Sequence, residues 1–242
     1  MSTFIFPRTV LRFVILGVAG VLLFSSLAWA GGEERRKLLR DSVSVLEEIM
    51  ETPEKGIPFD ALAKAKGIII FPTMVKGGFI LGIRYGKGVA SVRLPETGTW
   101  SPPAFLTTVG GSLGFQAGAE AVDLILLVMN QRGVESLLKD EFTLGGDVGV
   151  AAGPVGRHAE AAADLRMKGE IYSYSRSKGL FAGISFKGTS IHADNDANEL
   201  YYKAELSPKD ILILGKAGKL PESANRFIQA LNRLAPPLEK SK

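Results

Sequence analysis

Apolar residues recur along this chain with two periods, one typical of helices and one typical of strands, and the helical period comes first. The segment Glu33–Glu51 places apolar residues at steps of four, three and four, the spacing of one stripe on an amphipathic helix. The stripe consists of Leu39, Val43, Leu46 and Met50. A second, short helix is expected to begin at Pro58 and to end at Gly67. After Asp194 the helical spacing returns in "DANELYYKA", "SPKDILIL" and "PESANRFIQALNRL".

Between these helical regions the pattern is that of β-strands rich in β-branched residues and glycine. The expected strands lie in "GIIIFP", "GGFILGIRYGKGVASVRL", "FLTTVGGSLGFQAGAEAVDLILLVMN", "FTLGGDVGVAAGPVGR", "GEIYSYSRS" and "LFAGISFKGTSIHA". A hairpin turn is expected around Gly86-Lys87-Gly88 and another at Lys178-Gly179. One brief helix, "QRGVESLLKDE", interrupts the strands.

Strands gathered in the middle of a chain, with helices at both ends, indicate an α+β fold with mostly antiparallel pairing. Glycine inside strands is typical of bulges and sharp bends. We therefore expect a strongly curved sheet, up to a barrel-like one, flanked by N-terminal and C-terminal helices. The alternative role of these glycines is to let helices pack closely on the sheet.

Residues 1–30 have the layout of a secretory signal peptide. Arg8 and Arg12 precede an apolar run, and Ala28-Trp29-Ala30 supplies a cleavage site after Ala30. The alternative is an uncleaved anchor, but the apolar run is short for a bilayer span. The expected organisation is a signal peptide at 1–30, one domain at 31–235 and a flexible tail at 236–242 in an exported, periplasmic or peripherally membrane-associated protein.

Composition narrows the classes of partner. Removal of Arg8 and Arg12 would lower the formal charge from +4 to +2, so any electropositive function must come from local clustering. That charge density does not suit nucleic acid. The chain has no cysteine, so an exported protein of this sequence would depend on its core and not on disulfides for stability.

Two motifs suggest catalysis or metal binding, and each has a simpler interpretation. Residues 110–114 match G-x-S-x-G, the nucleophile elbow of hydrolases, with Ser112 as nucleophile and His158 or His192 as base. The motif requires a strand-to-helix turn, whereas further strand is expected here. The simpler interpretation is a small residue on a curved strand.

The second motif is a weak calcium-loop candidate, formed by Asp194, Asp196, Asn198 and Glu205. Its sixth position, which needs glycine, holds Glu199. The simpler interpretation is that Asp194 or Asp196 caps the following helix. No nucleotide-binding or zinc motif is present, and we expect no metal, no cofactor and no enzymatic activity.

An ordered set of segments resembles the SYLF domain family. The segments are "AKGIIIFP", "GGFILGIRYGKGVASVR", "GTWSPPAFLTTVGGSLGFQAGAEAVDLILLVMN", "AGPVGR" and "YSYSRSKGLFAGISFKG", and the resemblance extends from about Glu34 to Tyr202. The resemblance implies non-catalytic binding of anionic phospholipid, with a contribution from the basic amphipathic helix before the strands. It also implies actin binding in fungal relatives, which the bacterial type of export signal argues against here.

The candidate lipid-binding residues are the cations of that helix and of the ribbon at residues 169–190: Arg35, Arg36, Lys37, Arg40, Arg176, Lys178 and Lys187. A basic amphipathic helix can lie in a bilayer interface. Tyr172 and Tyr174 share the strand parity of Arg176 and could supply an exposed aromatic edge. The alternatives are solvated cations and a helix whose stripe packs on the sheet. The expected function is phospholipid binding in the cell envelope; the alternatives are an envelope protein-interaction module and a hydrolase.

Overall fold

The structure is a computed structural model that describes residues 31–51, 56–78, 81–113, 118–155, 169–177, 180–183 and 186–236. The expected signal peptide, His158, Lys178 and the tail beyond Pro236 lie outside the described residues. A helix occupies residues 31–50 and is called here the N-terminal helix. No helix within the described ranges combines the length and the apolar character needed to cross a bilayer.

The order of the remaining elements follows the sequence pattern closely. The helices are α2 (Phe59–Lys64), α3 (Gln131–Leu137), α5 (Asn195–Tyr202), α6 (Pro208–Leu212) and α7 (Glu222–Leu234). The strands are β1 (Gly67–Gly78), β2 (Leu81–Val92), β3 (Ala104–Leu113), β4 (Gly118–Val128), β5 (Glu141–Leu144), β6 (Val150–Ala152), β7 (Ile171–Ser177), β8 (Leu180–Gly183) and β9 (Thr189–Ala193).

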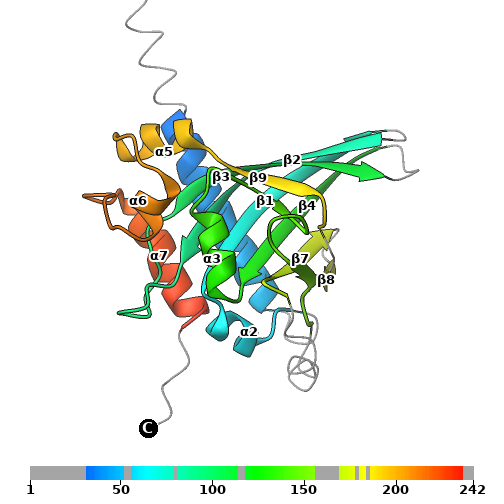
Figure 1. Cartoon of the computed structure of the whole chain (residues 1–242), viewed down its shortest axis with the longest axis horizontal. Coiled ribbons are helices and arrows are strands. Elements are labelled where there is room, and N and C mark those ends of the chain that lie inside the picture. Colours follow the sequence, from blue (N-terminus) through cyan, green and yellow to red (C-terminus); the bar gives the residue numbers. More distant parts are fainter. Residues whose placement is uncertain are drawn as a thin grey trace, which may run out of the picture.

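The strands form one strongly curved sheet, as expected (Figure 1). Their order is β5-β9-β3-β2-β1-β4-β7-β6, with β8 paired to β7. All described pairs are antiparallel except β6 with β7. The short segment 145–149 joins β5 at one end of this order to β6 at the other. The sheet is therefore barrel-shaped and nearly closed, and the α+β prediction is confirmed.

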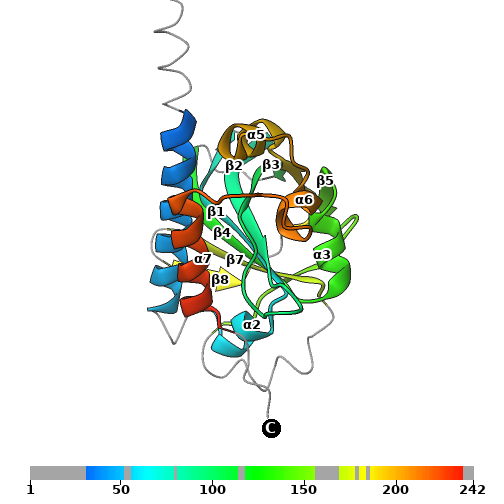
Figure 2. The same cartoon turned by 90° about the vertical axis from the view of Figure 1, so that its left-hand side faces the viewer.

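Alternate residues of the central strands enter two separate cores, because both faces of the sheet are covered. Ile68 and Ile70 pack on the face covered by the N-terminal helix, α2 and α7, while Ile69 and Phe71 pack on the face covered by α3 and α6. Figure 2 shows the N-terminal helix and α7 side by side on one side of the sheet. The apolar stripe of the N-terminal helix thus packs on the sheet, the alternative considered for it above.

The hairpin expected around Gly86-Lys87-Gly88 is wrong. Strand β2 runs without interruption through these residues, and its antiparallel partner β1 ends earlier in the sequence, at Gly78. The glycines are required by close packing: a Cβ at Gly88 would lie 2.3 Å from Cδ1 of Phe71, and one at Gly86 would lie 3.0 Å from Cγ of Met74. A glycine that makes room for a neighbouring strand has the same sequence signature as a glycine in a turn.

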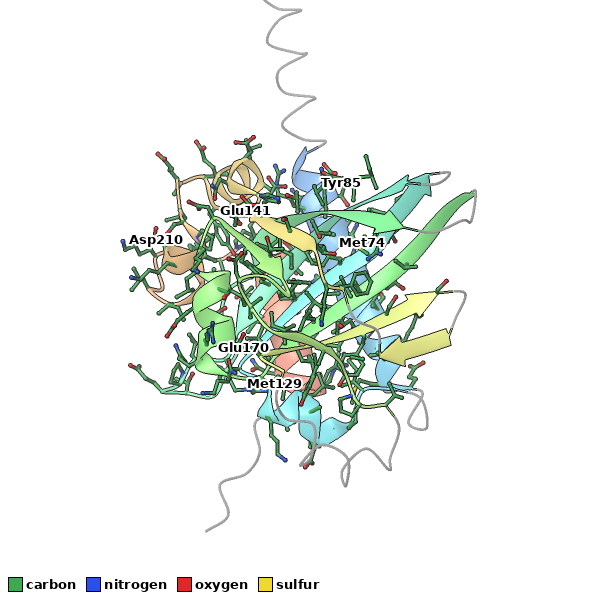
Figure 3. All side chains as sticks on the ribbon, turned by 45° about the vertical axis from the view of Figure 1, so that its right-hand side comes forward. Met74, Tyr85, Met129, Glu141, Glu170 and Asp210 are labelled. Carbon is green, nitrogen blue, oxygen red and sulfur yellow. The ribbon has the colours of Figure 1, made fainter. Side chains whose placement is uncertain are left out.

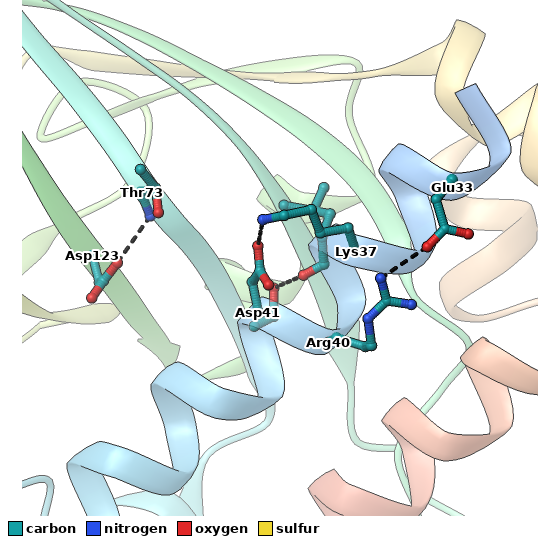
Figure 4. A network of polar contacts seen from close by, with 8 residues as sticks. Glu33, Lys37, Arg40, Asp41, Thr73 and Asp123 are labelled. Carbon is teal, nitrogen blue, oxygen red and sulfur yellow. Dashed lines mark hydrogen bonds and ion pairs between the residues drawn. The ribbon is translucent and has the colours of Figure 1, made fainter. Parts of the chain in front are cut away.

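Strand β1 carries a β-bulge in the segment Phe71–Met74, where its pairing with β2 and with β4 shifts by one residue. Thr73 occupies the left-handed region with φ of 62°, an uncommon conformation for a β-branched residue. Its backbone N–H donates a hydrogen bond to Asp123 Oδ1 at 2.9 Å (Figure 4). Beyond this point β1 to β4 project past the rest of the sheet (Figure 1).

The turn expected at Lys178-Gly179 lies outside the described residues; the residues on either side of it, Ser177 and Leu180, pair with each other. The single strand expected over residues 180–193 is wrong, because it divides into β8 and β9. Gly188, with φ of 75°, allows the chain to turn between them. Strand β8 pairs with β7, whereas β9 lies between β3 and β5 on the other side of the sheet.

Candidate functional site

A groove of about 650 Å³ lies between the N-terminal helix and α7. It is lined by Arg36, Leu39, Arg40, Val43, Ser44, Pro221, Glu222, Ser223, Arg226 and Phe227. The first five residues lie on one flank of the N-terminal helix and the rest lie at the start of α7. Two helices that cover the same sheet face therefore form the two walls of the groove.

The floor of the groove is apolar and rigid. Leu39 and Phe227 are buried in the core beneath it, and Val43 is half-buried against that core. The hydroxyls of Tyr201 and Ser223 share a hydrogen bond of 2.7 Å, which ties α7 to α5. Arg233 of α7 also forms an ion pair with Glu47 of the N-terminal helix at 2.5 Å. The separation of the two walls is thus fixed by packing and by polar contacts.

The rim of the groove carries three guanidinium groups and two carboxylates. Glu33 accepts from Arg36 Nη1 through Oε2 at 3.2 Å and from Arg40 Nη2 through Oε1 at 2.9 Å. The hydrogen bond from Arg40, together with the charges of both arginines, lowers the pKa of the Glu33 carboxyl. Arg226 of α7 pairs with Glu222 one turn earlier. All five side chains are about half exposed or more, so an anion can approach the arginines from solvent.

The four cations predicted on the N-terminal helix do not share one surface. Arg36 and Arg40 lie at the groove. Lys37 is exposed and pairs with Asp41 at 2.5 Å, near Thr73 and Asp123 (Figure 4). Arg35 is only 8% exposed, and its Nε has no hydrogen-bond partner among the described residues. Burial lowers the pKa of the Arg35 guanidinium.

The expected exposure of the β7 side chains is wrong, because the N-terminal helix packs on that face of the strand. Tyr172 and Tyr174 are buried in the same core as the helix, and burial raises the pKa of both phenols. Arg176 lies between the sheet and the helix. It pairs with Asp123 Oδ2 at 2.5 Å and with Glu48 of the N-terminal helix.

Lys187 is exposed in the turn before β9, beside Gly145. Its neighbour Phe186 packs in the core on the α3 and α6 side of the sheet. The structure therefore places Lys187 away from the groove. Lys178 lies outside the described residues.

Two residues of the calcium-loop candidate, Asp194 and Asn198, have other partners, whereas Asp196 and Glu205 are exposed. Asp194 caps α5 by accepting from the backbone N–H of Ala197 at 3.0 Å. Asn198 is fully buried, accepts from the backbone N–H of Phe105 at 2.8 Å and donates to its carbonyl at 3.3 Å. Over the described ranges, no three His, Cys, Asp or Glu residues are grouped so that they could hold a metal ion.

The G-x-S-x-G segment does not form a nucleophile elbow. Ser112 lies within β3, where its backbone pairs with Gly82, and the next described element is strand β4. The strand-to-helix turn that exposes a hydrolase nucleophile is therefore not formed at this position. His192, one of the two residues considered as a base, lies on β9. Its Nδ1 is 3.7 Å from Oε2 of Glu141 on the neighbouring strand β5.

The sequence interpretation missed the half of the groove that α7 supplies. Arg226 directly precedes the buried Phe227, so that cation lies at the border of the apolar face of α7. This repeats the arrangement of Leu39 and Arg40 on the N-terminal helix. A cation next to a buried apolar residue could have identified Arg226 as a candidate. The pattern does not predict that the N-terminal helix and α7, which are distant in sequence, pack side by side.

Comparison with known proteins places this architecture in a family. The family described as "Ysc84: Las17-binding protein actin regulator" matches residues 109–234. The rat "SH3 domain-containing YSC84-like protein 1" (Rattus norvegicus) is 35% identical over 189 residues, which are 78% of this chain and 53% of that protein. "Protein YSC84" of Saccharomyces cerevisiae is 38% identical over 185 residues, 75% of this chain and 39% of that protein.

A third relative, the yeast "LAS seventeen-binding protein 3" (Saccharomyces cerevisiae), is 42% identical over 162 residues, 66% of this chain and 35% of that protein. The chain thus spans about half of the rat relative's length and less of the two yeast proteins. The region matched by the family contains strands β4 to β9 and the helices α3, α5, α6 and α7. The chain belongs to the Ysc84/SYLF domain family.

Proposed function

We propose that this chain binds anionic phospholipid at a membrane surface, without catalysis, through the groove between the N-terminal helix and α7. The observation that carries the proposal is the arrangement of the groove, with Arg36, Arg40 and Arg226 on the rim of an apolar floor. A phospholipid has the same two parts, an anionic head group joined to acyl chains.

The physical basis of the proposal is complementary charge combined with burial of apolar surface. Guanidinium groups present planar forks of N–H donors that match the oxygens of a phosphate. Each cation close to an anionic membrane surface contributes about 1 kcal/mol. The apolar floor, with Val43 half-buried above Leu39 and Phe227, offers a place for the upper part of an acyl chain.

The cellular setting is also a proposal. Export and cleavage after Ala30 would place the chain in a bacterial envelope, in the periplasm or on a membrane surface. The support for this location is the basic and apolar pattern of residues 1–30 together with the Ala-Trp-Ala site.

The test is co-sedimentation with vesicles of phosphatidylcholine, with and without phosphatidylglycerol. The Arg40→Gln, Arg226→Gln double variant should bind the anionic vesicles about thirtyfold more weakly, because two cations that contribute about 1 kcal/mol each are lost from the rim. The control is the Lys64→Gln, Arg132→Gln double variant, which changes the net charge equally at two exposed cations outside the groove. Equal losses in both variants would contradict the groove as the site.

A second candidate function is protein binding without direct lipid contact. It is favoured by four exposed apolar residues on the projecting strands, Val75, Ile83, Tyr85 and Val109. They lie together because Tyr85 pairs with Val75 on β1 and with Val109 on β3; Tyr85 is labelled in Figure 3. Absence of binding to either kind of vesicle would favour this candidate over the first, whereas vesicle binding that is indifferent to lipid charge and to salt would contradict the electrostatic basis of the first.

A further inference from the structure

We propose that the carboxylate of Glu33 occupies the position of the phospholipid phosphate, so that the lipid must displace it to bind. This inference rests on the proposed function and identifies the residues that set the affinity of the same groove. Glu33 and Glu222 then compete with the lipid phosphate for the arginines. When lipid binds, the arginines exchange a carboxylate partner for a phosphate.

The geometry of Glu33 is that of a bridging ligand. Its two oxygens contact two different arginines, Oε1 with Arg40 and Oε2 with Arg36. The phosphodiester of a phospholipid also presents two free oxygens on one central atom, and it forms charge-assisted hydrogen bonds of the same kind with guanidinium groups. A phosphate that takes the place of the carboxylate therefore keeps both arginines paired.

The exchange requires little reorganisation. The side chain of Glu33 is 57% exposed, and exposed ion pairs contribute little to folding stability. Glu33 can thus rotate into solvent while the helix and the groove floor stay in place. On the opposite wall Glu222 holds Arg226 in the same way, with an even more exposed side chain.

Two measurable properties follow from the exchange. The affinity of the native chain for anionic lipid is lower than that of a groove with free arginines. Its dependence on salt is also shallower, because the ion pairs formed with lipid replace ion pairs that already exist. Neutralising Glu33 should raise the affinity and steepen the salt dependence together.

The test is Glu33→Gln, with binding measured by co-sedimentation with phosphatidylcholine vesicles containing phosphatidylglycerol, over a range of sodium chloride concentrations. We expect binding to become about two- to fivefold tighter, the factor that corresponds to release of an exposed ion pair. The matched control is Asp60→Asn, which makes the same change in net charge and releases Lys64 from an ion pair on α2. This control should change the affinity less and leave the salt dependence as in the native chain.

A second variant shows that the effect acts through the arginines. In an Arg36→Gln, Arg40→Gln background, the gain from Glu33→Gln should disappear. In a further experiment, inorganic phosphate is added to the vesicle-bound chain at matched ionic strength. Displacement of the chain from the vesicles would mean that the phosphate group alone is recognised. No displacement would mean that the acyl chain of the lipid is also needed.

The outcomes separate the two proposals. If the native chain binds anionic vesicles and Glu33→Gln binds no more tightly than Asp60→Asn, the exchange is overturned and the proposed function stands. If the gain persists in the background without Arg36 and Arg40, the exchange is overturned as well. If the native chain and both variants fail to bind anionic vesicles, the proposed function fails and the exchange fails with it.

Discussion

Gly88 illustrates how single residues set the packing of this sheet. A Cβ at this position would lie 2.3 Å from the ring of Phe71 and 2.6 Å from the carbonyl oxygen of Ile70. Both neighbours are buried, so neither can move aside without disturbing the core. The position accepts only glycine because β1 and β2 approach each other closely at the bulge.

Replacing Gly88 with alanine should lower the free energy of unfolding by about 2 kcal/mol, the typical result of overpacking a core. The measurement is urea unfolding followed by circular dichroism. Gly111→Ala is the matched control, since a Cβ at Gly111 meets no atom within 4 Å. Similar stabilities for the two variants would contradict the assigned cause.

The partners of individual cations were the least predictable feature of the site. The sequence identified Arg36 and Arg40 as exposed cations on an amphipathic helix, and they do line the groove. The sequence pattern also predicted Arg35 and Arg176 as exposed cations. Arg35 is buried, and Arg176 forms ion pairs with both Glu48 and Asp123. A residue pattern gives the face of an element, but the element that will cover that face depends on the tertiary fold.

Among the elements, α6 has the most complete N-terminal cap. Ser207 and Asp210 form a capping box, in which the Ser207 side chain accepts from the backbone N–H of Asp210 and Asp210 accepts from the backbone N–H of Ser207. Lys216 also pairs with Asp210 at 2.8 Å. Asp210 is labelled in Figure 3. The capping box satisfies two backbone donors that a short helix would otherwise leave free.

The hydrogen bonds from Lys216 and Ser207 lower the pKa of the Asp210 carboxyl to about 2. Because this pKa is lower in the folded chain, Asp210 stabilises α6 above its ordinary pKa, and that contribution is lost as the pH falls towards about 2. Titration of the side-chain carboxyl by NMR should give a midpoint near this value. In Lys216→Gln the midpoint should move up towards the ordinary aspartate range; an unchanged midpoint would exclude Lys216 as the main cause.

At the element scale the sequence predicted the order of the described helices well, because each has a clear apolar period and a capping or breaking residue. The turns were harder. Gly86 and Gly88 suggested a turn but serve close packing, whereas residues 180–193 looked continuous but divide at Gly188. Both errors have one cause: glycine marks a special backbone requirement without saying which one.

For the whole molecule, the curved sheet was predictable as a class but its strand order was not. The separation of β8 from β9, and the pairing of β9 with both β3 and β5, follow from contacts distant in sequence. The groove was unpredictable for the same reason, since its walls come from the first and the last of the described helices. The residue pattern predicted the N-terminal helix, which forms one wall, whereas the position of α7 as the other wall depends on the tertiary fold.

The exposed apolar residues on the projecting strands predict self-association at high concentration. An exposed apolar cluster on a strand region favours contact between copies. Ile83→Lys should reduce the concentration-dependent rise in sedimentation coefficient measured by analytical ultracentrifugation, because it replaces one apolar member of the cluster with a charged side chain. Leu200→Lys, at an equally exposed apolar residue on α5, should leave the rise unchanged. Absence of any rise in the native chain would contradict the prediction.

The bulge at Thr73 has a further consequence for how the length of β1 can vary. Before it, even-numbered residues such as Ile68 and Ile70 face the N-terminal helix; after it, the even-numbered Met74 belongs to the opposite core. One additional residue relative to both β2 and β4 produces this change of parity. Loss of Thr73 would therefore leave every later residue on its present side, while loss of a residue elsewhere in β1 would reverse them. Loss of one residue from this strand is therefore tolerable at the bulge, where it removes one hydrogen bond to Asp123.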